Sequence, residues 1–146
     1  MPTAARLAGA AMFVLLALVA SSMMVPLFGD GAVPRQFHAI NVFAALLAGW
    51  ATLGSRAGQG ITASFANAFT ALGVFLFWML FVHGFNEMID RAFRKYYDGP
   101  LEAIVAVFER MIDIASRVLT VETVLLLVIG SLLASFAAEY AARHFR

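Results

Sequence analysis

The stretch ITASFANAFTALGVFLFWMLFV, residues 61–82, decides the fold class of this chain because it is apolar throughout and carries no charge. A helix rises about 1.5 Å per residue, so roughly 20 apolar residues cross a hydrocarbon layer about 30 Å thick. No water is available inside a bilayer, so a spanning segment must satisfy its own backbone hydrogen bonds, which favours a helix. The stretch therefore predicts a transmembrane helix over residues 61–83.

Three further apolar windows meet or approach the same length. They lie at residues 7–28, 37–53 and 123–142. We therefore expect an all-α integral membrane protein with four transmembrane helices in one domain, residues 1–146. Pro26 should end or kink the first helix. The first window could instead be a cleaved signal peptide with Arg6 as its charged end, but no soluble domain follows it, so we expect it to be retained.

The composition agrees with this class. Hydrophobic residues make up 62% of the 146 residues and charged residues 13%, against about 45–50% and about 25% in soluble domains. These values argue against a disordered chain, a basic nucleic-acid-binding domain and an ordinary cytosolic enzyme. The absence of cysteine excludes disulfides, thiolate catalysis and Cys-ligated metals. The expected partners are the lipid bilayer and other membrane protein subunits, with no nucleic acid.

The connection between the third and fourth spans differs from the two short, glycine-containing loops before it. Apolar residues recur at helical spacing over residues 85–96, which predicts about three further turns of the third helix. The sequence DGP at residues 98–100 should end it and start an amphipathic helix over residues 100–119. We expect this helix to be interfacial and to bury its apolar stripe, either in the headgroup plane or across the ends of the other helices. The stripe includes Leu101, Val105, Phe108 and Ile112. Three i,i+4 ion pairs are expected here: Glu87–Arg91, Asp90–Arg94 and Asp113–Arg117.

Small residues at helical spacing predict close helix packing, within the bundle or against another subunit. The fourth span carries Gly130, Ala134 and Ala138, and the second carries Ala45 and Gly49. A similar track in the third span includes Gly73. Asn67 in that span predicts an interhelical hydrogen bond, with a ligand site as the alternative.

Candidate cofactor ligands are few. His38 begins the second span and His83 ends the third, so connectivity places both at the same side of the membrane. A haem or quinone site there is the alternative that we keep open. We otherwise expect no cofactor, metal or catalytic residue, and the lack of charge in the middle of any span argues against a transporter.

Four spans place both termini on one side of the membrane. Arg6, Arg56, Arg143 and Arg146 lie on that side. The opposite side holds Arg35, Arg91, Arg94, Lys95, Arg110 and Arg117. The count slightly favours outside termini, but the amphipathic helix can distort it, so the orientation stays open.

Three stretches carry a family resemblance: MPTAARL at residues 1–7, GSRAGQG at residues 54–60 and YDGPLEAIVAVFE at residues 97–109. With the order of apolar segments, they make the chain similar to the TrgA family of bacterial tellurium-resistance membrane proteins. The resemblance implies an inner-membrane location and a link to tellurite resistance, without a mechanism or a catalytic residue.

The residues limit what that resemblance can mean for this chain. Without cysteine, the chain cannot reduce tellurite with its own thiols. We therefore predict a non-enzymatic protein that acts through membrane partners. The alternatives are an accessory subunit of a respiratory or photosynthetic complex, and the haem- or quinone-binding protein.

Overall fold

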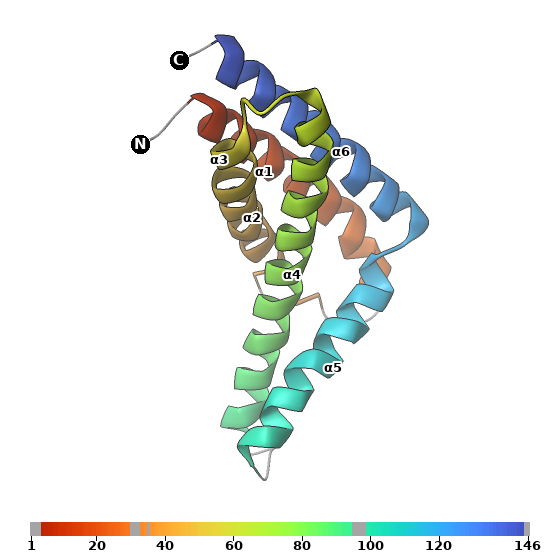
Figure 1. Cartoon of the computed structure of the whole chain (residues 1–146). Coiled ribbons are helices and arrows are strands. Elements are labelled where there is room, and N and C mark those ends of the chain that lie inside the picture. Colours follow the sequence, from red (N-terminus) through yellow and green to blue (C-terminus); the bar gives the residue numbers. More distant parts are fainter. Residues whose placement is uncertain (1–3, 30–32, 35, 95–98, 145–146) are drawn as a thin grey trace.

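The computed structural model describes residues 4–29, 33–34, 36–94 and 99–144, and these residues form helices and no strands (Figure 1). The first half of the chain contains α1 (Ala4–Met24), the 3-10 turn η1 (Val25–Phe28), α2 (Phe37–Ala48), the π-helical turn η2 (Gly49–Leu53) and α3 (Gly54–Arg56). The second half contains α4 (Ile61–Phe93), α5 (Pro100–Val118) and α6 (Val121–His144).

Four helical segments are long and apolar enough to cross a membrane, which confirms the four helices expected from the sequence. They are Ala4–Phe28, Phe37–Arg56, Ile61–Phe93 and Val121–His144. Pro26 converts the end of the first segment into a 3-10 turn, because it cannot donate the backbone hydrogen bond of a continuing α-helix. The second segment stays helical through a π turn, which extends it beyond the predicted residue 53.

The four segments pack together as one bundle. α1 contacts α2 and α6, and α4 contacts the same two helices from the other side. In the core, the rings of Phe13 on α1 and Phe75 on α4 pack edge to face, with centroids 6.1 Å apart. The start of α1 and the end of α6 lie at the same end of the bundle (Figure 1), as an even number of spans requires.

The helix α4 extends past the other helices, and α5 folds back along this extension to form a helical hairpin (Figure 1). A Cβ atom on Gly84 would lie 2.8 Å from the carbonyl oxygen of Val107, so only glycine allows this approach of the two backbones. Here α4 ends at Phe93, before the predicted residue 96, and the predicted break at Asp98 lies outside the described residues.

The structure shows how α5 packs within the chain. The helix runs along α4 rather than across the ends of the bundle, and its buried residues are Val107, Ile114 and Val118. The predicted apolar stripe is not covered by the described part of the chain itself: Leu101 is 75% exposed, Val105 48%, Phe108 54% and Ile112 70%. The apolar side of α5 is wider than the surface that α4 can cover. The close approach of the two backbones at Gly84 decides which part of that side packs against α4.

Candidate functional site

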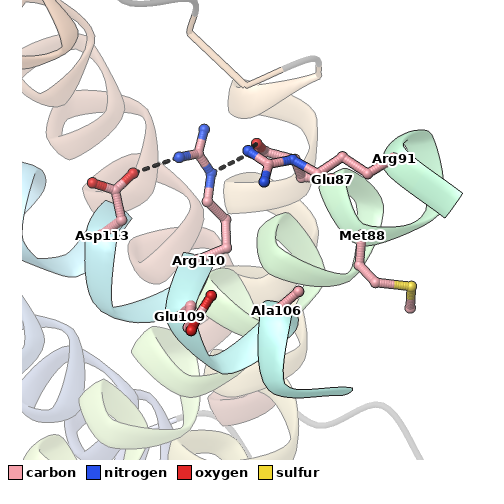
Figure 2. A pocket seen from close by; sticks show the side chains of 7 residues that line it. All are labelled: Glu87, Met88, Arg91, Ala106, Glu109, Arg110 and Asp113. Atoms are coloured by element: carbon pink, nitrogen blue, oxygen red, sulfur yellow. Dashed lines mark hydrogen bonds and ion pairs between the residues drawn. The ribbon is translucent and has the colours of Figure 1, made fainter. Parts of the chain in front are cut away.

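The α4–α5 hairpin carries a network of charged side chains between its two helices (Figure 2). Arg110 on α5 donates to Glu87 on α4 and, at 2.5 Å, to Asp113 on its own helix. The network extends to Arg91, which pairs with Glu87 at 2.8 Å, and to Arg117, which pairs with Asp113 at 3.1 Å. These contacts confirm two of the three expected i,i+4 pairs; Asp90 and Arg94, both described, form no ion pair.

A cavity of about 170 Å³ opens beside this network. It is lined by Glu87, Met88, Arg91, Ala106, Glu109, Arg110 and Asp113 (Figure 2). Three acidic and two basic side chains line it, so it offers charges of both signs within a short distance. Glu87, Arg91, Arg110 and Asp113 in this lining are joined to one another by the ion pairs described above.

A buried polar chain lies at the base of the hairpin, where three helices meet. The Asn41 amide on α2 donates to the Ser21 hydroxyl on α1 at 2.8 Å. Nε2 of His83 on α4 lies 3.0 Å from Oδ1 of Asn41, and since that oxygen only accepts, Nε2 carries the proton. The three side chains are at most 2% exposed. The chain thus ties α1, α2 and α4 together at this end of the bundle.

Only one of the two ring nitrogens of His83 has a hydrogen-bond partner among the described residues. Its ring stacks on Phe37, with centroids 5.0 Å apart. Its Nδ1 is buried and has no hydrogen-bond partner within the described part of the chain. The structure thus leaves one acceptor atom of a buried side chain free, which a bound water molecule could satisfy.

The two histidines predicted as weak ligand candidates have different environments. His38 is exposed at the start of α2, whereas His83 is buried and bonded to Asn41. His83 therefore pairs with Asn41, which lies one helical turn after His38, and not with His38 itself. Among residues 4–29, 33–34, 36–94 and 99–144, no group of three or more His, Asp or Glu side chains is placed to hold a metal ion.

The opposite end of the bundle contains a carboxylate site that the sequence analysis missed. Glu139 on α6 is 5% exposed and accepts the backbone N–H groups of Gly58 at 2.6 Å and Gly60 at 3.0 Å. Arg143, one turn later, donates to the same carboxylate at 3.0 Å. The signal that could have revealed this site was the glycine-containing loop before α4, because its backbone N–H groups need acceptors when they are buried.

The small residues singled out in the sequence lie at helix contacts inside the bundle. Ala134 and Ala138 on α6 and Ala45 on α2 are at most 1% exposed. A Cβ on Gly130 would lie 2.3 Å from a methyl carbon of Leu16 on α1. These residues therefore let α6 and α2 pack closely against their neighbours in the same chain.

Two further predicted packing residues lie nearer the end of the bundle that holds the start of α1 and the end of α6. Gly49 faces the backbone of Gly9 on α1. Asn67 is buried on α4, and its amide donates to the carbonyl oxygen of Arg56 at 3.4 Å. Arg56 ends the second membrane-length segment, so this is an interhelical hydrogen bond of the kind predicted from the sequence.

Comparisons of the chain with protein-family models, with curated proteins and with solved structures gave no match.

Proposed function

We propose that this chain is a multi-pass protein of the bacterial inner membrane that supports tellurite resistance without catalysing a reaction, by binding other membrane proteins. The resemblance of residues 1–7, 54–60 and 97–109 to the TrgA family supports the link to tellurite. The lack of cysteine supports an indirect role, because thiol chemistry on tellurite then has to come from another molecule.

The observation that carries the partner-binding role is the α4–α5 hairpin. It projects from the bundle and presents the charged cavity beside Glu87 and Arg110 (Figure 2). Only three side chains of α5 are buried, so most of this helix is not used to hold the fold together. A helix that packs so little of its surface internally is suited to binding something outside the chain.

The test is tellurite tolerance in a strain that lacks the gene. We expect the deletion to lower the minimal inhibitory concentration of tellurite and the unchanged gene to restore it. Arg110→Ala should restore it poorly, because the variant loses the ion pairs that organise the charged cavity. Arg56→Ala, which removes an exposed arginine at the opposite end of the bundle, should restore it fully at equal membrane levels. Unchanged tellurite sensitivity of the deletion strain would refute the resistance role.

An accessory subunit of a respiratory or photosynthetic complex is the second candidate, because the same projecting hairpin would suit a permanent subunit contact. Gentle detergent extraction followed by native electrophoresis separates the two functions. Co-migration of the chain with a large complex in the absence of tellurite would favour the accessory subunit. Migration as a free protein would count against it.

A further inference from the structure

The hairpin has a second surface that differs in chemistry from the charged cavity. We call it the apolar flank, and it consists of Phe85 on α4 and Leu101, Ile104, Val105, Phe108 and Ile112 on α5. All six side chains are between 41% and 75% exposed. Contiguous exposure of this kind marks a surface that is covered in the cell.

Helical geometry places the apolar flank on the side of the hairpin away from the ion pairs. Successive residues of a helix are turned by about 100°, so residues two apart point about 160° away from each other. Phe85 is two residues from Glu87, and Phe108 is two residues from Arg110. The Glu87–Arg110 pair closes one side of the α4–α5 contact, so Phe85 and Phe108 lie on the other side.

Lipid is the occupant that the rest of α4 indicates. The rings of Phe77, Phe81 and Phe85 stack in sequence along one side of α4, with centroids 5.8 Å and 6.0 Å apart. Phe77 belongs to the apolar part of the span and is 50% exposed, so it faces the hydrocarbon when the helix is inserted. The aromatic row leads from this lipid-facing surface to the apolar flank without a charged residue in between.

We infer that the apolar flank of the hairpin is embedded in the lipid at the membrane interface. The opposite side, which carries the Glu87–Arg110 pair and the charged cavity, faces water and is left free for a partner. This inference concerns the opposite surface from the proposed partner contact and holds whether or not the protein has a role in tellurite resistance. It also explains why α5 leaves its widest apolar surface unpacked, since lipid rather than protein covers that surface.

Site-directed spin labelling tests the inference directly, because the chain has no cysteine and every labelled site is unique. Ile104→Cys and Phe108→Cys report on the apolar flank. Glu109→Cys and Glu102→Cys, on the polar side of α5, are the matched controls. Each variant of the full chain is labelled with a nitroxide and reconstituted in vesicles of phosphatidylcholine and phosphatidylglycerol. Collision rates are then measured with oxygen, which concentrates in lipid, and with a water-soluble nickel chelate.

We expect the ratio of oxygen to nickel collisions to be several-fold higher at residues 104 and 108 than at residues 109 and 102. Equal ratios, with ready access of nickel to residues 104 and 108, would overturn the inference by placing the flank in water. Low access of both reagents would overturn it by showing protein cover. Spin–spin broadening would identify that cover as a second copy of the chain. All four positions are exposed, and circular dichroism of each variant checks that its helices are retained.

Discussion

The contact between α1 and the π-helical turn η2 provides the sharpest test of the packing. A Cβ atom on Gly49 would lie 2.4 Å from the carbonyl oxygen of Gly9 and 2.8 Å from Cα of Ala10. Ordinary van der Waals contact begins at 3.4 Å, so in Gly49→Ala the two helices must separate by about 1 Å. Both obstacles are backbone atoms, which cannot rotate away as a side chain could.

The expected loss of stability follows from two opposing effects. Adding a methyl group to a filled interior costs about 1–3 kcal/mol, and a backbone obstacle places Gly49→Ala near the upper end of that range. Replacing glycine by alanine inside a helix returns about 1 kcal/mol. The net expectation is a decrease of about 2 kcal/mol in the free energy of unfolding. For a chain of this size, such a decrease lowers the melting temperature by about 4–8 °C.

The assay is unfolding in mild detergent, by titration with SDS and by heating, with helix content followed by circular dichroism. Gly73→Ala on α4 is the control, because a Cβ there meets no atom within 4 Å. It should leave stability unchanged or raise it by up to about 1 kcal/mol through helix propensity. If Gly49→Ala proves as stable as Gly73→Ala, the close contact between α1 and η2 and the reasoning from it are refuted.

Two further predictions concern the polar contacts. Asn41→Ala should lower the free energy of unfolding by about 1–2 kcal/mol, because it removes both bonds of the buried polar chain; Asn86→Ala at an exposed position of α4 should not, and equal SDS titrations of the two would contradict the prediction. Glu139→Gln should speed amide hydrogen exchange in the Gly58–Gly60 loop by roughly tenfold or more, since a neutral amide is a weaker acceptor than a carboxylate. Glu122→Gln at the exposed start of α6 is its control, and unchanged exchange in Glu139→Gln would show that the carboxylate does not hold the loop.

The α4–α5 hairpin shows which structural features a local sequence pattern can predict. The apolar spacing after residue 83 predicted that α4 would continue, and the proline and charge pattern of residues 100–119 predicted a two-faced helix; both were confirmed. The pattern did not predict that α5 would pack along α4. That choice depends on the backbone approach at Gly84, which involves two segments distant in sequence.

The amino-acid sequence by itself determined that four long apolar helices form and roughly where along the chain they lie, because helix length and hydropathy depend only on neighbouring residues. Only the tertiary structure decided which polar groups meet: Asn41 rather than His38 faces His83, and Glu139 on the last helix caps the loop before α4. These pairings depend on the rotation and tilt of each helix about its axis. Rotation and tilt are set by the shapes of all neighbouring helices at once, and the periodicity of one segment does not contain them.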